Sequence, residues 1–295
     1  MATDASHPIP HLISTIDELR ATVASERQRG GRIGLVPTMG ALHAGHLSLV
    51  EISNQECDVT IATIFVNPKQ FSPHEDLDKY PRTIERDLEL LSRLRVPFVF
   101  APMEEEIYPA GFSTFVDPPS VALPLEGELR LHHFRGVATV VLKLFNLVQA
   151  DVAYFGQKDY QQSLVIRRMV EDLGLPITIK ICPIIREQDG LAMSSRNRYL
   201  SSAERLQALA ISRALDDARQ LVEAGERDAN RLRNTLRQVL EQAAISKIEY
   251  VQIVHPETLD ELDQIGDAAI ALIAVQVGKT RLIDNCLFKY EENSN

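Results

Sequence analysis

Short apolar runs recur along the first two-thirds of the chain. They lie at residues 33–37, 58–66, 96–101, 151–156 and 177–185. Each run is nearly continuous in apolar residues rather than alternating with polar ones. Strands that are apolar on both faces are typical of a parallel sheet covered on both sides, and we therefore expect these runs to form such a sheet.

Segments with the apolar spacing of a helix lie between these runs, at residues 46–55, 83–93, 134–148 and 160–173. This alternation of strand and helix predicts βαβ units. Residues 1–185 are therefore expected to form an α/β domain with a doubly wound, Rossmann-like parallel sheet. Ligands of such sheets bind beyond the carboxyl ends of the strands, so residues that directly follow a strand are the first candidates for function.

The pattern changes after about residue 186. Ser201 and Glu204 form a capping-box sequence before a long amphipathic helix, and Asp228 can cap a second helix. Residues 248–254 and 269–277 predict strands, after which we expect a polar tail. Residues 186–295 are thus predicted to be a smaller C-terminal α+β domain. No flexible Gly/Ser linker separates the two domains, so we expect the second to pack closely and act as a lid.

Composition and charge disfavour several classes of protein and partner. The 295 residues are 45% hydrophobic and 24% charged, as in a globular protein, and the net charge of -10 disfavours a nucleic-acid partner. Cys57, Cys182 and Cys286 are odd in number and far apart, which predicts neither disulfides nor a zinc cluster and favours a reducing cytoplasm. The first 30 residues carry no apolar core segment, and no later stretch reaches ~18 apolar residues, so secretion and membrane insertion are not expected.

The segment GLVPTMGALHAGHLSLV, residues 34–50, is the first candidate for chemistry. Gly40 and Gly45 flank a turn after a predicted strand, and His43 and His46 stand where the next helix begins. Backbone N–H groups at a helix start, with imidazole donors added, can bind a phosphate chain. The alternative is an ordinary turn with two surface histidines.

Three further segments follow predicted strands. FGQKDYQQ places Lys158 and Asp159 where they can meet phosphate and ribose, and VNPKQF places the amides of Asn67 and Gln70 beyond another strand. MSSRN, residues 193–197, could close over a triphosphate. Each of these segments, taken alone, could also be a polar loop.

Taken together, these segments resemble a known family. The His-x-Gly-His pattern is similar to the signature of the nucleotidyltransferase superfamily, which is shared with class I aminoacyl-tRNA synthetases. PTMGALHAGH, FVNPKQF, EDLDKYPRT, HFRGVATVVLKLFN, FGQKDYQQ and MSSRNRYLS, in this order, resemble the pantoate-β-alanine ligase family from about residue 16 to 286. The resemblance implies that ATP adenylates pantoate with loss of pyrophosphate, and that β-alanine then displaces AMP to give pantothenate.

The resemblance also implies residue roles. Catalytic roles fall to His43, His46, Lys158, Ser194, Ser195 and Arg196, with His46 as the family's proton donor. ATP binding falls to Met39, Gly40, Ala41, Leu42, His43, Ala44, Gly45, His46, Gly156, Gln157, Lys158, Asp159, Ile185, Met193, Ser194, Ser195 and Arg196. Substrate binding is expected of Asn67, Gln70, Arg130 and Gln162. We expect Mg²⁺ to be carried by the ATP phosphates with no protein metal ligand, and a cytoplasmic homodimer.

One segment departs from the family pattern. Where many members have Arg-Pro-Gly-His-Phe, this chain has Arg130-Leu131-His132-His133-Phe134, and the loss of the Pro-Gly pair could change the loop. We expect His132 and His133 to be solvated loop residues, and Asp87 to be a helix-surface carboxylate rather than a partner of magnesium.

Other functions stay open on sequence grounds. One is a nucleotidyltransferase that releases the nucleotidylated product. Others are a non-catalytic nucleotide sensor and, with less support, a tRNA synthetase. The presence of His43, His46, Lys158 and the MSSR residues argues against a pure sensor, which need not keep groups that serve pyrophosphate departure. No anticodon-binding region or basic tract is evident, which argues against a tRNA synthetase.

Overall fold

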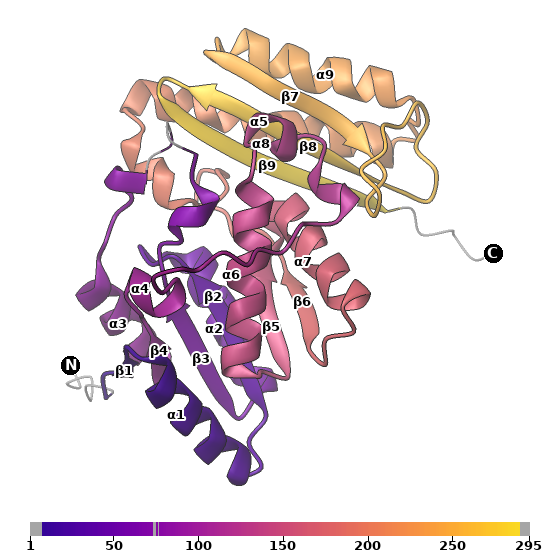
Figure 1. The fold of residues 1–295 in the computed structure, drawn as a ribbon. Helices are drawn as coiled ribbons and strands as arrows, with labels where there is room; N and C mark the ends of the chain where they lie inside the picture. The colour runs from indigo at the N-terminus through magenta and orange to yellow at the C-terminus, as the bar shows by residue number, and fades with distance from the viewer. Residues whose placement is uncertain (1–7, 73–74, 76, 290–295) are drawn as a thin grey trace. The chain divides into compact units, whose positions relative to one another are not determined.

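The computed structural model describes residues 8–72, 75 and 77–289, which fold into two compact units (Figure 1). The first, here called the sheet unit, comprises the described residues up to Gln157 together with Gln161–Pro183. The second, here called the C-terminal unit, comprises Lys158–Tyr160 and the described residues from Ile184 onward. A short segment of the FGQKDYQQ motif therefore belongs to the second unit. The predicted lid role of residues 186–295 stays a prediction.

The sheet unit contains a six-stranded parallel sheet in the order β1-β4-β3-β2-β5-β6 (Figure 1). Its strands are β1 (His11–Ile13), β2 (Ile33–Thr38), β3 (Val59–Ile64), β4 (Phe98–Phe100), β5 (Val152–Gly156) and β6 (Thr178–Cys182). Its α-helices are α1 (Ile16–Gln28), α2 (Ala44–Glu56), α3 (Ile84–Arg93), α4 (Glu104–Ile107), α5 (Glu126–Leu129), α6 (His133–Val148) and α7 (Tyr160–Asp172). The predicted α/β fold is confirmed, whereas β1 and α1 were not predicted.

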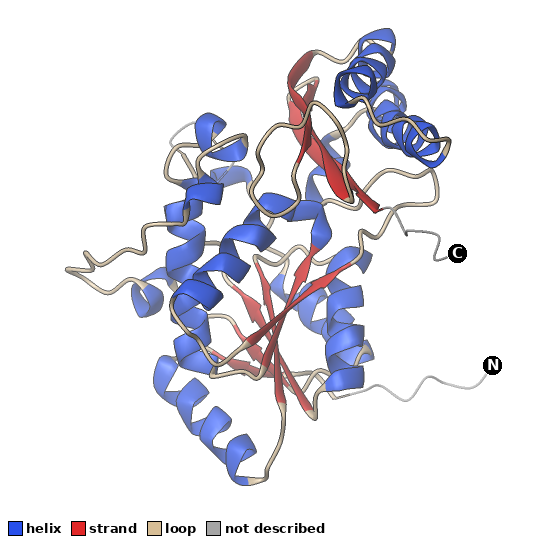
Figure 2. Cartoon of the chain, turned by 90° about the vertical axis from the view of Figure 1, so that its right-hand side faces the viewer, coloured by secondary structure: helices blue, strands red, loops and turns tan. Residues whose placement is uncertain are grey.

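Helices cover both faces of this sheet (Figure 2). Successive side chains of a strand point to opposite faces, so Leu35 packs in one buried cluster with α1 and α6 residues, while Val36 packs in another with α2 residues. Tyr154 and Phe155 divide in the same way on β5. Burial on both faces explains why the central strands β2, β3 and β5 are nearly continuously apolar in sequence.

The strand order reverses beside β2. From β2 the chain continues to β3 and β4 on one side of the sheet, whereas β5 and β6 lie on the other side. Thr38, the last residue of β2, pairs with Ile64, the last residue of β3, so the two strands end at the same level. A doubly wound sheet binds its ligands at such a reversal, so the loop after β2 is a candidate for ligand binding.

The C-terminal unit is a three-stranded antiparallel sheet, β7-β8-β9, packed with two helices. Its elements are α8 (Ser202–Glu223), α9 (Ala229–Gln242), β7 (Lys247–Val254), β8 (Ala268–Val277) and β9 (Thr280–Lys289). The capping box of Ser201 and Glu204 is present, and Asp228 accepts the N–H groups of Asn230 and Arg231 at 2.8 and 3.0 Å. The predicted α+β character of this part is confirmed.

The expected polar tail at the end of the chain lies outside the described residues, and residues 280–289 were not predicted to form a strand. They form β9, which pairs with β8 along its whole length. Leu282 and Phe288 are buried in the apolar core, and the polar Asp284 is also buried because it pairs with Arg186 at 2.6 Å. Buried polar residues made this strand look like a solvated segment. Within the described residues, no helix is long and apolar enough to cross a membrane.

Candidate active site

The loop after β2 has an unusual backbone conformation. Gly40 and Ala41 are consecutive residues with positive φ, at +80° and +51°. A side chain at Gly40 would also lie 3.0 Å from Ile64, so glycine suits both the backbone and the space there. Left-handed backbone is unfavourable for alanine, so other contacts must hold this turn in place.

Two histidines follow this turn at the start of α2. His43 is the N-cap, and its Nδ1 accepts the N–H of Gly45 at 3.1 Å. Since Nδ1 accepts, the ring proton is on Nε2, which can donate to a phosphate oxygen. The rings of His43 and His46 stack with centroids 4.0 Å apart. A helix start with imidazole donors is a suitable site for an anion.

Asp87 of α3 holds the turn. Its Oδ2 accepts the N–H of Ala41 and its Oδ1 accepts the N–H of Leu42, both at 2.9 Å, and Thr83 donates its hydroxyl to Oδ2 at 3.2 Å. The expectation of a helix-surface carboxylate is therefore wrong, because Asp87 is 1% exposed. It lies one turn from the buried Leu91, so the helical period places both on the inner face of α3. With both oxygens bound to N–H groups, Asp87 is poorly suited to bind magnesium.

The segment after β3 is the short 3₁₀-helix η1 (Pro68–Gln70), which Asn67 caps. Asn67 is buried, and its Nδ2 donates to Oε1 of Gln70 and to the carbonyl of Gly136, each at 3.1 Å. The Nε2 of Gln70 lies 3.1 Å from the sulfur of Met39, in the loop after β2. The structure thus brings together Met39, Asn67 and Gln70. Both amide protons of Asn67 are used within the protein, and its predicted substrate contact stays a prediction.

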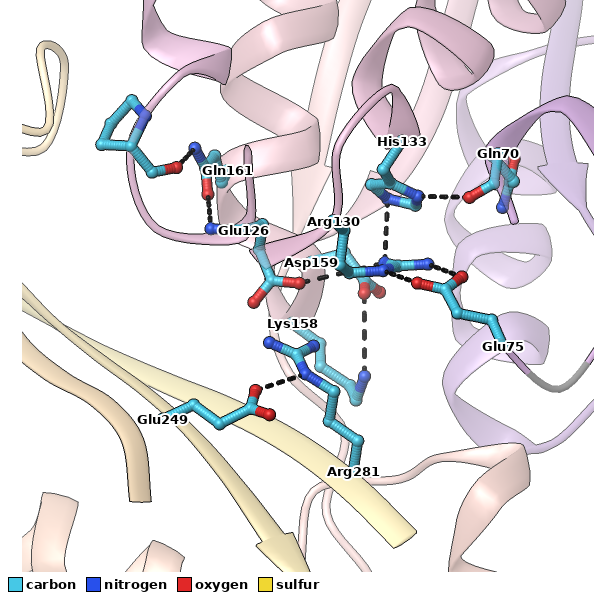
Figure 3. Close-up of polar contacts among 11 residues, drawn as sticks. Gln70, Glu75, Glu126, Arg130, His133, Lys158, Asp159, Gln161, Glu249 and Arg281 are labelled. Atoms are coloured by element: carbon cyan, nitrogen blue, oxygen red, sulfur yellow. Dashed lines mark hydrogen bonds and ion pairs between the residues drawn. The ribbon is translucent and has the colours of Figure 1, made fainter. Parts of the chain in front are cut away.

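The segment that departs from the family pattern forms a connected polar cluster (Figure 3). Arg130 binds Glu75 with two parallel hydrogen bonds, at 2.7 and 2.8 Å. Its Nη1 also donates to Nε2 of His133 at 3.1 Å, and Nδ1 of His133 donates to the main-chain carbonyl of Gln70 at 2.9 Å. These contacts join the start of α6 to η1.

The expectation that His133 is a solvated loop residue is also wrong. Its side chain is buried in the first turn of α6. Burial, with the charge of Arg130, lowers the pKa of His133 from 6.5 to about 4. The unfolded chain therefore binds this proton first as the pH falls, and the histidine reduces stability between about pH 6.5 and 4. Burial would raise the pKa of Glu75, but the hydrogen bonds from Arg130 prevail and lower it.

His132 is the exposed residue just before α6. Its φ is +69°, the left-handed conformation that glycine adopts most easily. The resemblance aligns this position with the glycine of Arg-Pro-Gly-His-Phe, and this chain has a left-handed residue here without a glycine. Histidine is among the residues that tolerate this conformation better than most.

The remaining candidates of the sheet unit lie around β5. Gly156 ends that strand and Gln157 begins the next turn, while Gln162 lies half-buried on α7. Their carboxyl-end position is the one predicted from the sequence for ligand-binding residues. Their roles stay predictions.

The other candidates belong to the C-terminal unit. Lys158 lies 3.8 Å from Asp159, and its main-chain carbonyl accepts Nδ2 of Asn285 at 3.0 Å, which fastens the segment to β9. The carbonyl of Ile185 accepts the N–H of Met193 at 2.9 Å. The structure therefore joins Ile185 to the start of the MSSRN segment through the main chain.

The MSSRN segment forms a short 3₁₀-helix, η5 (Ser195–Tyr199). Ser194 caps it by accepting the N–H of Arg196 at 3.3 Å. The buried Asn197 donates to Glu187 at 2.6 Å, and Glu187 in turn accepts from Arg205 of α8 at 2.6 Å. This Asn197–Glu187–Arg205 network links the end of the MSSRN segment to α8. Sequence reasoning missed it because nothing in the spacing of these residues marks a contact.

Comparisons with known proteins decide the family. Residues 11–287 match the family model described as pantoate-beta-alanine ligase. The chain belongs to this family. It is 53% identical over 278 residues to the pantothenate synthetase of Roseiflexus castenholzii, covering 94% of this chain and 99% of that protein. It is 52% identical over 280 residues to pantothenate synthetase 1 of Bradyrhizobium diazoefficiens, covering 95% and 98%.

Solved structures of family members agree. The crystal structure of pantothenate synthetase from Thermus thermophilus matches with a TM-score of 0.89 and 45% identity, covering 94% of this chain and 98% of that one. The ligase from Francisella tularensis, described as complexed with beta-gamma ATP and beta-alanine, matches with a TM-score of 0.78 and 34% identity, covering 94% and 97%. The resemblance inferred from the six sequence segments is confirmed at the level of family and fold.

Proposed function

We propose that this protein condenses pantoate with β-alanine to form pantothenate, through a pantoyl-adenylate made from ATP. Membership of the pantoate-β-alanine ligase family over residues 11–287 carries the proposal. The Francisella relative, described with an ATP compound and β-alanine, supports the same substrates here. The loop after β2, placed where the strand order reverses, supplies a helix start suited to phosphate.

The proposed mechanism follows from the poor reactivity of a free carboxylate. Its oxygen is a poor leaving group, whereas an acyl-adenylate can lose AMP when an amine attacks. The first step therefore has to bring the pantoate carboxylate to the α-phosphate of ATP, against the repulsion of two anions. His43 and His46 at the start of α2 would donate to phosphate oxygens and stabilise charge on the departing pyrophosphate.

Further residues are predicted to bind the phosphates. Lys158 can neutralise phosphate charge, and Arg196 can bind phosphate oxygens in a two-pronged geometry. Ser194 and Ser195 add hydroxyl donors, and the Asn197–Glu187–Arg205 network keeps their segment in one conformation. The ATP-binding roles of Gly156, Gln157 and Ile185 complete this part of the proposal.

Gln70 and Gln162 would bind pantoate, and Arg130, which is bound to Glu75 and His133, would lie near the pantoate or β-alanine pocket. Magnesium would arrive on the ATP phosphates. Among the described residues, no group of three or more His, Cys, Asp or Glu side chains is arranged to hold a metal ion, and both oxygens of Asp87 already accept N–H groups. A cytoplasmic location and a homodimer stay predictions, the second of which sedimentation equilibrium would measure.

The deciding experiment is product analysis. With Mg-ATP, pantoate and β-alanine, the protein should form AMP, pyrophosphate and pantothenate in equal amounts. Pyrophosphate release followed by a stable nucleotidylated product, with no dependence on β-alanine, would contradict the proposal and favour a nucleotidyltransferase. A protein that binds ATP but releases no pyrophosphate would be a sensor. The family comparisons favour the ligase over both.

Two variants test the phosphate contacts. His46→Ala and Lys158→Ala should each slow adenylate formation by orders of magnitude while the protein stays folded, because each removes a donor to developing charge. His255→Ala, at an exposed residue of the C-terminal unit, is the control and should leave the rate unchanged. A near-normal rate in either of the first two variants would remove that residue from the mechanism.

A further inference from the structure

The orientation of the Asn67 side chain is set by two main-chain groups. The N–H of Lys69 donates to Oδ1 of Asn67 at 3.3 Å, and the carbonyl of Gly136 accepts from Nδ2 at 3.1 Å. A main-chain N–H can only donate and a carbonyl can only accept, so the oxygen and nitrogen of this amide cannot be exchanged. The second proton on Nδ2 then points at Oε1 of Gln70, 3.1 Å away.

The amide orientation of Gln70 follows from that of Asn67. Because its Oε1 accepts from Asn67, the other end of the amide, Nε2, points to the weakly accepting sulfur of Met39, 3.1 Å away. The main chain of Gln70 is also held, since His133 donates to its carbonyl at 2.9 Å (Figure 3). Gln70 is thus fixed both in place and in amide orientation.

Tyr108 completes this arrangement from a distant part of the chain. Its hydroxyl donates to Oδ1 of Asn67 at 2.7 Å, the shortest hydrogen bond of the Asn67 side chain. Its ring is buried, with the ring centroids of Phe65 and Phe112 at 6.1 and 4.9 Å. Burial raises the pKa of the Tyr108 phenol, so the hydroxyl keeps its proton and remains a donor.

Close packing of α6 makes the geometry possible. A Cβ on Gly136 would lie 2.2 Å from the carbonyl oxygen of Lys69 and 2.7 Å from the nitrogen of Gln70. Only glycine lets the helix approach η1 closely enough for its carbonyl to reach Nδ2 of Asn67. The Tyr108–Asn67–Gln70 relay is therefore built from a helix, a 3₁₀ turn and a distant tyrosine.

We propose that Tyr108 is a positioning residue for the substrate that Gln70 binds, acting through Asn67 to turn the amino end of the Gln70 amide toward that substrate. The inference rests on the proposed function, which assigns Gln70 to pantoate. With Nε2 presented, Gln70 donates, so its ligand must offer an oxygen acceptor such as a hydroxyl or carboxylate oxygen. A group that can only donate, such as an ammonium, is disfavoured at this point because two donors would face each other.

The kinetic test uses Tyr108→Phe. Loss of one neutral hydrogen bond should raise KM for pantoate about 3- to 10-fold, with KM for ATP and for β-alanine changed less than about twofold. In a Gln70→Ala background, the same substitution should add no further increase, since Tyr108 acts only through Gln70. Tyr154→Phe is the matched control. It also removes a buried phenol hydroxyl of the sheet unit, hydrogen-bonded to Glu56 at 3.1 Å, and should lower stability without changing KM for pantoate.

A second measurement, hydrogen exchange of side-chain amides, tests the Tyr108–Asn67–Gln70 relay independently of catalysis. The side-chain amide protons of Asn67 should exchange with solvent far more slowly than those of the exposed Asn230, and Tyr108→Phe should accelerate the exchange about tenfold or more. Equal exchange at Asn67 and Asn230 would overturn the relay whatever the activity. An unchanged KM for pantoate in Tyr108→Phe, or a full additional increase in the Gln70→Ala background, would overturn the positioning role. A wild-type protein that makes no pantothenate would instead overturn the proposed function.

Discussion

Asparagine in place of Asp87 would replace one buried oxygen with an amino group where α3 holds the loop after β2. Oδ2 accepts the N–H of Ala41 and Oδ1 accepts the N–H of Leu42. Either orientation of an asparagine amide therefore turns its NH₂ toward a main-chain N–H. Thr83 can rotate its hydroxyl to suit the change, but the main-chain donors cannot.

These contacts set the loss of stability expected for Asp87→Asn. A buried donor that loses its acceptor destabilises the folded state by about 1–3 kcal/mol. Ala41 has φ +51°, and a left-handed conformation costs a non-glycine residue about 1–2 kcal/mol, so the loop can relax once one of its anchors is lost. We expect Asp87→Asn to lower the free energy of unfolding by about 2–3 kcal/mol. Because the relaxed loop would misplace His43, KM for ATP should rise about tenfold or more.

Urea unfolding measures the first effect, and pyrophosphate release at varied ATP concentration measures the second. The matched control is Glu85→Gln, which neutralises an exposed carboxylate of the same helix and should change stability by less than about 1 kcal/mol. If the free energy of unfolding of Asp87→Asn were within about 0.5 kcal/mol of the wild-type value, the hydrogen bonds from the loop to Asp87 would not contribute the stability expected of them. If stability fell while KM for ATP stayed constant, the loop would be structural and separate from ATP binding.

Three further substitutions test the segment around α6. His132→Gly should raise the free energy of unfolding by up to about 1 kcal/mol by relieving the left-handed backbone, whereas His132→Ala, which keeps a Cβ, should give no such gain in urea. His133 is expected to lower the free energy of unfolding by up to about 3 kcal/mol as the pH falls from 6.5 to 4, and His133→Asn should reduce this pH dependence. A free energy of unfolding that does not change over this range in the wild type would contradict the lowered pKa. Gly136→Ala should destabilise by about 1–3 kcal/mol and raise KM for pantoate, since its Cβ would force η1 to move. Gly266→Ala, where a Cβ meets nothing within 4 Å, is the control and should be neutral or slightly stabilising in thermal melts.

The elements that the sequence predicts well are those whose burial leaves a compositional trace. β2, β3 and β5 are largely buried on both faces and are nearly continuously apolar. β1 has three residues, of which only Ile13 is buried, so its pattern carries too little signal. β9 was missed for a different reason: Asp284 and Asn285 are buried because they have partners far away in sequence, and their polarity hides the strand.

The residues of the candidate site also fall into two groups, those that the sequence predicts and those that it does not. The HxGH and MSSRN segments are short and continuous, so residue type and spacing are enough to propose them. Asp87, His133 and Tyr108 act through partners 45, 63 and 41 residues away, and no local pattern records such a contact. Helical periodicity could have placed Asp87 on the same face as Leu91, but a buried carboxylate is expected only when its hydrogen-bond partners are known.

Two carboxylates, the buried Asp87 and the partly exposed Glu187, change how the acidic composition should be understood. A surplus of negative charge is expected to cover the surface of a protein that binds ATP, yet Asp87 lies inside it, beside the loop proposed to bind phosphate. Its charge does not oppose an anion as a bare carboxylate would, because two main-chain N–H groups are bound to its oxygens. Glu187 plays the corresponding part for the MSSRN segment, where its charge is balanced by Arg205. In both places a carboxylate accepts with both oxygens at once, which a neutral amide cannot do. Acidic residues therefore contribute to anion binding here by holding the loops that carry the donors.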